Sequence, residues 1–111
     1  MIRLGVLGST RGTDLQAILD AIQNHTLDAE VVVVVSNRKK SYILERARHH
    51  NIPDVFVYQK GKTRNEFDRE ITAALLQHNA DLVLLVGFMR ILSAEFCRKW
   101  QDRILNVHPS L

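Results

Sequence analysis

The sequence predicts an α/β protein with a mainly parallel sheet and helices on both faces. Short, continuously apolar segments alternate with segments whose apolar residues recur at helical spacing. Residues 31–35 and 82–86 contain only aliphatic side chains, as strands do when both faces of a parallel sheet are covered. Regular alternation of strand and helix implies right-handed crossovers, so we expect a Rossmann-like arrangement.

The first strand is expected over residues 4–7, and a glycine-rich loop follows it. Thr13 and Gln16 have the spacing of a capping box, which predicts that a helix begins there. Four apolar residues then recur at i, i+3, i+4 and i+7 and mark one face of that helix: Leu15, Ile18, Leu19 and Ile22.

The second strand is expected over residues 31–35, and a second helix over residues 41–50. The Asn-Ile-Pro segment at residues 51–53 would end this helix. A short third strand is expected over residues 55–58. The basic residues between Arg38 and His50 are most simply a solvated loop and helix face, with attraction of anions as the alternative.

The second half of the chain continues the alternation. Thr63 and Glu66 form another capping-box pair, and the helix that they introduce places Phe67, Ile71, Ala74 and Leu75 inward and ends near Asn79. Residues 82–86 predict a central strand. Ser93 can cap a short helix in which Phe96 and Trp100 meet at i, i+4, and a last strand is expected over residues 104–108.

Composition argues against several functional classes. The net charge of +3 and the aromatic content of 6% do not provide the basic stripe and stacking platforms of a nucleic-acid-binding protein. The apolar runs are too short to span a bilayer, so we expect neither nucleic acid nor membrane as a partner. The single cysteine, Cys97, and the lack of a signal-peptide pattern favour a reducing, cytoplasmic location. The histidines have no metal-ligand spacing with cysteines or carboxylates, so no metal is expected.

Three segments are expected at the carboxyl edge of the sheet, where open α/β proteins bind their ligands: residues 8–14, 87–92 and 106–110. In the first of them, Gly8 and Gly12 permit a tight turn into a helix, whose free N–H groups and dipole favour an anion, and Arg11 adds positive charge. The spacing fits neither the dinucleotide fingerprint nor the P-loop, so a single phosphate is the better ligand. The alternative is an ordinary strand-to-helix turn that needs glycine only for its geometry.

Asn106 and His108 are two residues apart on the last expected strand, so their side chains point to one face. An amide and an imidazole placed in this way can stabilise a developing oxyanion, or the imidazole can donate a proton. The alternative is a polar pair that simply ends a strand, followed by the turn that Pro109 favours.

Taken together, three motifs resemble the phosphoribosylglycinamide formyltransferases of purine synthesis. They are Gly-Ser-Thr-Arg-Gly-Thr-Asp-Leu-Gln-Ala-Ile at residues 8–18, Gly-Phe-Met-Arg-Ile-Leu-Ser at residues 87–93 and Asn-Val-His-Pro-Ser-Leu at residues 106–111. The resemblance implies the formyltransferase fold and a one-carbon transfer. The formyl group would pass from 10-formyltetrahydrofolate, a co-substrate, to the amine of glycinamide ribonucleotide.

The resemblance also implies roles for individual residues. The ribonucleotide phosphate would be held by Gly12, Thr13 and Asp14. The folate site would be lined by Arg64, Met89, Arg90, Ile91, Leu92 and Asn106. Asn106 would orient the formyl oxygen, and His108 would be the proton donor. The family usually has Asn at the position of Asp14. The carboxylate of Asp14 would repel a phosphate, and the positive charge of Arg11 could offset this repulsion.

The family continues beyond the point that corresponds to Leu111, through further strands and a catalytic aspartate. Residues 1–111 are therefore expected to be the truncated amino-terminal part of one formyltransferase domain, inactive alone, from a monomer or homodimer. Alternatives are another folate-dependent formyl-transfer or formyl-hydrolysing relative, and a non-catalytic phosphate-binding domain.

Overall fold

The computed structural model describes residues 1–107 of the chain. Strands and helices alternate throughout, in the order β1 (Ile2–Leu7), α1 (Thr13–Gln23), β2 (Ala29–Ser36), α2 (Tyr42–His49), β3 (Asp54–Phe56), α3 (Arg64–Gln77), β4 (Leu82–Val86), α4 (Ala94–Lys99) and β5 (Ile104–Val107). None of these helices is long and apolar enough to cross a bilayer.

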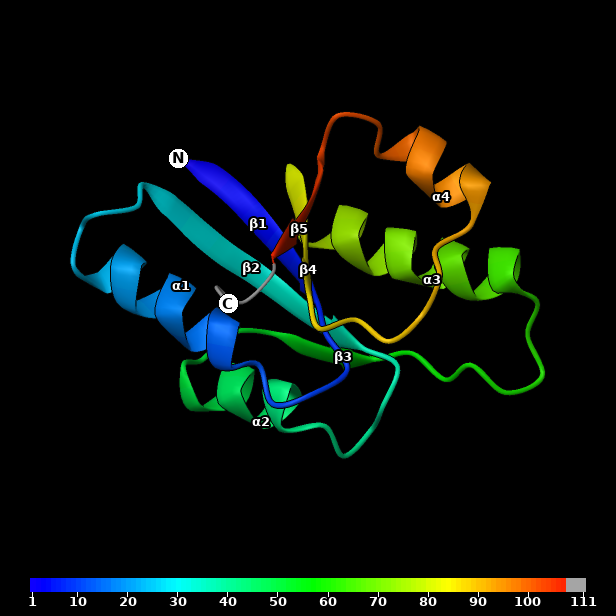
Figure 1. The fold of residues 1–111 in the computed structure, drawn as a ribbon, viewed down its shortest axis with the longest axis horizontal. Helices are drawn as coiled ribbons and strands as arrows, with labels where there is room; N and C mark the ends of the chain where they lie inside the picture. Colours follow the sequence, from blue (N-terminus) through cyan, green and yellow to red (C-terminus); the bar gives the residue numbers. More distant parts are fainter. Residues whose placement is uncertain (108–111) are drawn as a thin grey trace.

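The strands of the described chain form one sheet in the order β3-β2-β1-β4-β5, and every pair in it is parallel. The chain first winds outward from β1 to β3 and then returns to place β4 on the other side of β1. Helices α1 and α2 therefore cover one face of the sheet, and α3 and α4 cover the other (Figure 1). The predicted Rossmann-like fold is confirmed, and its topological switch point lies between β1 and β4.

Two apolar clusters hold the layers together, one on each face of the sheet. On the α1 and α2 face, the buried side chains include Leu4, Val6, Leu15, Ile43, Leu44 and Val34. On the α3 and α4 face, they include Leu7, Val83, Phe67, Ile71, Leu75, Phe96 and Trp100. Because neighbouring residues of β1 point to opposite faces, this one strand anchors both clusters and fixes the loop that follows it.

Two of the three predicted side-chain helix caps are confirmed. The Thr63 hydroxyl accepts the Glu66 N–H, and the Glu66 carboxylate accepts the Thr63 N–H, so the capping box of α3 is complete. The Ser93 hydroxyl accepts the Phe96 N–H at the start of α4.

The capping box predicted for Thr13 and Gln16 is wrong. The N-cap of α1 is Gly12, in the left-handed conformation and without a side-chain cap, and Thr13 is already helical. The side chain of Gln16 instead donates to Asp20 and accepts from Arg46. The third strand also ends earlier than expected, at Phe56.

Candidate active site

A pocket of about 250 Å³ lies at the switch point, where the loop after β1 faces the end of β4. Its lining residues are Thr10, Arg11, Gly12, Thr13, Asp14, Val86 and Gly87. The predicted phosphate residues Gly12, Thr13 and Asp14 therefore lie together around one hollow at the carboxyl edge of the sheet. Ligands of open α/β sheets bind at this position.

Two glycines allow close approaches around the pocket, Gly12 between the loop and α2 and Gly87 between the end of β4 and the loop. Gly12 has φ 72°, and a Cβ atom there would lie 2.4 Å from Cγ1 of Ile43. Gly87 has φ 62°, and a Cβ atom there would lie 2.8 Å from Oγ1 of Thr10. Both positions combine a left-handed backbone with a neighbour too close for a side chain, so each requires glycine.

The backbone of the loop presents a run of free donors. Within residues 1–107, no acceptor receives the N–H groups of residues 10–15, whereas on either side of them the Ser9 N–H donates to Gly87 O and the Gln16 N–H donates to Gly12 O, both at 3.1 Å. These groups include the unpaired donors that begin every helix, and they adjoin the positive end of the α1 dipole. The loop can therefore hold an anion with backbone groups alone.

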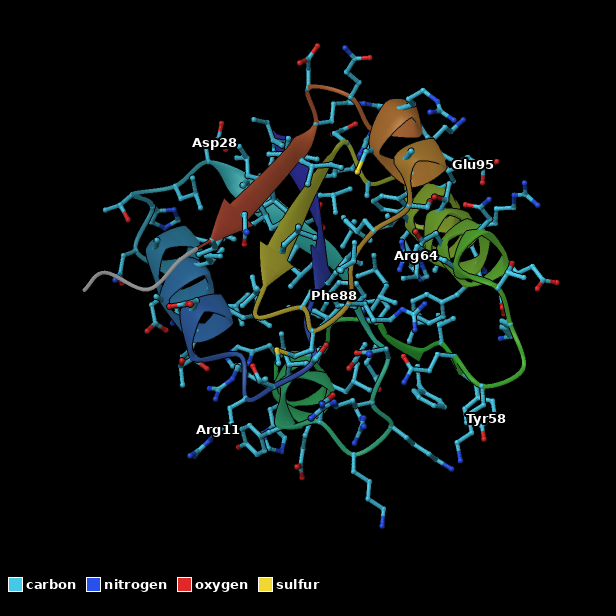
Figure 2. The ribbon with its side chains drawn as sticks, turned by 45° about the vertical axis from the view of Figure 1, so that its right-hand side comes forward. Arg11, Asp28, Tyr58, Arg64, Phe88 and Glu95 are labelled. Atoms are coloured by element: carbon cyan, nitrogen blue, oxygen red, sulfur yellow. The ribbon has the colours of Figure 1, made fainter. Side chains whose placement is uncertain are left out.

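The charged side chains of the loop do not pair with each other. Arg11 is exposed and extends from the loop into solvent (Figure 2). Asp14 is half-buried, and among the described residues Arg11 forms no ion pair with it. Any compensation of the Asp14 charge by Arg11 thus acts through solvent and is screened by salt.

A chain of hydrogen bonds joins this loop to the predicted folate segment. The Met89 N–H donates to Oγ of Ser9 at 2.8 Å, and that hydroxyl donates to Oδ1 of Asn37 at 2.6 Å. Nδ2 of Asn37 donates to Oε1 of Gln59 at 3.2 Å, and the same oxygen accepts from Nη1 of Arg90 at 3.0 Å. Residues after β1, β2, β3 and β4 therefore form one polar network along the sheet edge.

Four of the six residues predicted to line the folate site follow β4 directly, and they differ in exposure. Met89 is 62% exposed and Ile91 is 74% exposed. The guanidinium of Arg90 is instead turned onto the protein, with Cζ 4.3 Å from the centroid of the Phe67 ring. Leu92 is half-buried against the apolar cluster of the α3 and α4 face. Met89 and Ile91 thus provide free apolar surface, while Arg90 and Leu92 fix the segment to the core.

Arg64 is the first residue of α3 and is exposed. Phe67 and Asp68 follow it at i+3 and i+4, on the same side of the helix. The ring of Phe67 packs against the guanidinium of Arg90, and the carboxylate of the buried Asp68 accepts the Ser93 N–H at 2.6 Å. The segment from Arg90 to Ser93 therefore runs along the α3 face that Arg64 begins, and Figure 2 shows Arg64 and Phe88 on this side of the molecule.

The capping box of α3 fixes the backbone at Arg64, the first residue of the helix. Backbone and side-chain hydrogen bonds from Thr63 hold the pKa of the Glu66 carboxyl below its usual value. The Glu66 carboxylate therefore stays ionised, and keeps its hydrogen bond to the Thr63 N–H, to a lower pH than an unpaired glutamate would.

Asn106 is exposed near the end of β5, where it lies opposite Leu85 of β4. The parallel register of these strands brings Asn106 to the edge at which Gly87 leaves β4. His108 lies outside the described residues, so the pairing of Asn106 with His108 stays a prediction. Among residues 1–107, no group of three or more metal-binding side chains comes together.

Sequence reasoning missed four polar residues that build this edge: Ser9, Asn37, Gln59 and Asp68. Three of them are almost fully buried, since Ser9, Asn37 and Asp68 are 2%, 7% and 2% exposed. The available signal was the position of Ser9 and Asn37 directly after predicted strands. It does not reveal their partners, because these come from other loops.

The strand order and the glycine loop between β1 and α1 define the class of this protein as Rossmann-like α/β. The family model described as formyl transferase matches residues 2–111. The chain belongs to the formyl transferase family.

Similar proteins agree with this assignment. The chain is 43% identical to the trifunctional purine biosynthetic protein adenosine-3 of Chironomus tentans, over 98% of this chain and 8% of that protein. It is 38% identical to the phosphoribosylglycinamide formyltransferase of Haemophilus influenzae, over 100% of this chain and 53% of that enzyme. The crystal structure of glycinamide ribonucleotide transformylase 1 from Symbiobacterium toebii matches with a TM-score of 0.93 and 40% identity, over 100% of this chain and 53% of that one. The chain thus spans about half the length of these formyltransferases.

Proposed function

We propose that the full-length protein containing this chain transfers a formyl group from 10-formyltetrahydrofolate to the amine of glycinamide ribonucleotide. The supporting observation is the pocket at the switch point, whose loop has free backbone donors in a chain that is similar to glycinamide ribonucleotide formyltransferases over its whole length. We further propose that residues 1–111 are the amino-terminal part of a single formyltransferase domain and that they are inactive alone.

The ribonucleotide phosphate binds at the loop after β1. The N–H groups of Gly12, Thr13 and Asp14 donate to its oxygens, and the α1 dipole favours its charge. The Asp14 side chain takes no part, because a carboxylate beside a phosphate is repulsive. Backbone recognition makes this site tolerant of Asp at that position.

The folate lies against the segment after β4. Exposed Met89 and Ile91 offer apolar contact for its ring system, with Arg90 and Leu92 forming the base that holds them. Arg64, at the start of α3, attracts the anionic end of the folate. Asn106 completes the site near the formyl group.

The transfer requires one new C–N bond and the loss of another. The amine attacks the formyl carbon, and negative charge grows on the formyl oxygen. The amide of Asn106 donates to that oxygen, and His108 supplies a proton to the folate nitrogen as its bond to carbon breaks. The attacking amine releases a proton, so the reaction is balanced without metal or redox chemistry.

The test is an assay of the purified full-length protein with both substrates. We expect formylated glycinamide ribonucleotide and tetrahydrofolate to form in equal amounts. Formate in place of the formylated product would identify a formyl-hydrolysing enzyme. Ribonucleotide binding without any turnover would identify a phosphate-binding protein, and either result would overturn the proposal. The predictions of a cytoplasmic location and of a monomer or homodimer stay predictions.

A further inference from the structure

Arg46 of α2 is docked onto the pocket loop and is not part of a solvated helix face as the sequence suggested. Its Nε donates to the carbonyl oxygen of Arg11 at 3.1 Å, and its Nη1 donates to Oε1 of Gln16 at 3.0 Å. The guanidinium carbon also lies 5.0 Å from the centroid of the Tyr42 ring. These three contacts fix both the position and the plane of the guanidinium.

A second contact from α2 reaches the same loop. The N–H of Ile43 donates to the carbonyl oxygen of Thr10 at 3.0 Å. Together, Ile43 and Arg46 take up the carbonyl groups of two successive peptides, Thr10–Arg11 and Arg11–Gly12. The described chain has no cis peptide bond, so in each of these peptides the N–H points away from its own C=O.

The consequence for the pocket follows from peptide geometry. Because both carbonyls face α2, the N–H groups of Arg11 and Gly12 are directed away from α2. The pocket is lined by residues 10–14, Val86 and Gly87, and no residue of α2 is among them. The N–H groups of Arg11 and Gly12 are therefore turned to the side of the loop on which the pocket lies.

We propose that Arg46 is a positioning residue for the phosphate site: by holding the Arg11 carbonyl, it keeps the Gly12 N–H directed into the pocket. This inference rests on the proposed function, because it assumes that the loop binds the phosphate of the ribonucleotide. Arg46 acts through the backbone of the loop and is not itself a ligand of the phosphate.

Arg48 provides a matched control on the same helix. It carries the same charge two residues further on, but its Nε pairs with Oδ2 of Asp54 at 2.9 Å, on the side of β3. Among residues 1–107, Arg46 forms no ion pair with a carboxylate. A purely electrostatic effect of Arg46 would therefore depend strongly on salt, whereas an effect on peptide orientation would not.

The experiment measures the Kd of glycinamide ribonucleotide by calorimetry, and the KM of each substrate, for the full-length wild type and for Arg46→Ala, Arg46→Lys and Arg48→Ala. We expect Arg46→Ala to weaken ribonucleotide binding roughly tenfold, as for loss of a charge-assisted hydrogen bond, and to leave the folate KM unchanged. Arg46→Lys, which keeps one donor but not the contact with Gln16, should lose less. Arg48→Ala should stay within about twofold of the wild type, as expected for an exposed ion pair.

Each outcome separates this inference from the proposed function. A tenfold effect that persists in ~0.5 M salt, where charges are screened within a few ångströms, supports positioning. An effect that vanishes at this salt concentration, or equal Kd values for Arg46→Ala and Arg48→Ala, overturns the inference and leaves the proposed function intact. A wild-type protein that does not bind the ribonucleotide overturns both. Circular dichroism checks that Arg46→Ala is folded. If Arg46→Ala does not fold, the Kd of Arg46→Lys is compared with that of Arg48→Ala instead.

Discussion

The hydroxyl of Ser9 accepts the N–H of Met89 at 2.8 Å, although the two residues are 80 positions apart in the sequence. The same hydroxyl donates to Oδ1 of Asn37 at 2.6 Å, and Ser9 is buried. One small polar side chain thus joins the proposed phosphate loop to the proposed folate segment. Under the proposed function, this side chain therefore sets the placement of the two substrates relative to each other.

Ser9→Ala should both destabilise the protein and disturb folate binding. The substitution leaves the part-buried N–H of Met89 and the buried amide oxygen of Asn37 without their partner, and an unsatisfied buried group costs about 1–3 kcal/mol. We expect that loss in urea unfolding, together with an increase in the folate KM. Thr26→Ala is the control, because it removes an exposed hydroxyl bonded only to the Ala21 carbonyl. Equal losses in the two variants would show that the Ser9 network has no special role.

Gly12→Ala and Gly61→Ala form a matched pair for the pocket loop. Both glycines have positive φ, 72° and 77°, but a Cβ atom at Gly61 would meet nothing within 4 Å. Gly61→Ala should therefore cost only the left-handed strain, about 1–2 kcal/mol. Gly12→Ala adds a clash with Ile43, and we expect roughly 2–4 kcal/mol together with loss of ribonucleotide binding. Thermal unfolding and calorimetry measure the two effects. A similar loss of stability in both variants would mean that the side chain of Ile43 moves aside at little energetic cost.

The elements that sequence reasoning located correctly are those determined by local chemistry. The Thr63–Glu66 capping box forms as its spacing predicts, and residues 31–35 and 82–86 lie within strands. The Thr13–Gln16 pair has equally good spacing, but α2 takes up the carbonyls of Thr10 and Arg11 and thereby sets the loop backbone. Contacts between distant residues override a local signal in that case.

The register in which β2 pairs with β1 could not be predicted from the local sequence either. Leu4 is opposite Val31 and Gly5 is opposite Val33, so Val32 is an extra residue in the pairing of β1 with β2. A run of identical valines carries no information about which residue is extra. The polar network of the site was hidden for a related reason. Each of its members is an ordinary loop residue until the sheet brings four loops to one edge.

Asp81 should make the stability of the protein sensitive to acid. Its carboxylate accepts the Arg3 N–H at 3.0 Å and pairs with the Arg3 guanidinium at 3.2 Å. The hydrogen bond from the Arg3 backbone, followed by the charge of Arg3, lowers the pKa of Asp81 below its usual value. A lowered folded-state pKa stabilises the protein above the unfolded-state pKa, and this stabilisation is lost as the pH falls through the folded-state value.

Asp81→Asn should therefore be less stable than the wild type at neutral pH, and the difference should shrink below about pH 4. Unfolding midpoints measured between neutral pH and strong acid test this. Asp28→Asn, which removes a carboxylate without an ion pair in residues 1–107, is the control. A constant difference across the whole pH range would show that the effect of Asp81 is not linked to its ionisation.

In the full-length protein, Asn106→Ala should lower kcat with little loss of stability. Among the described residues, Asn106 is exposed near the end of β5, so its substitution leaves no cavity within residues 1–107. Loss of one donor to a developing oxyanion costs on the order of 10²–10³ in kcat. Leu105→Ala is the control: Leu105 is the preceding residue of β5, is 54% exposed and points to the opposite face. We expect it to keep near-normal kcat.

His108→Ala in the full-length protein should lower kcat by about 10²–10⁴, as for loss of a general acid. If Asn106 and His108 serve one transition state, the double mutant loses less than the product of the two single losses, because each group works fully only when the other is present. The Kd of the ribonucleotide should barely change in any of the three, since its phosphate is held at the loop after β1. Measurement of kcat and Kd for the three variants decides the matter. Near-normal kcat in either single variant would assign that residue a structural role, and strictly multiplicative losses would show that the two residues act independently of each other.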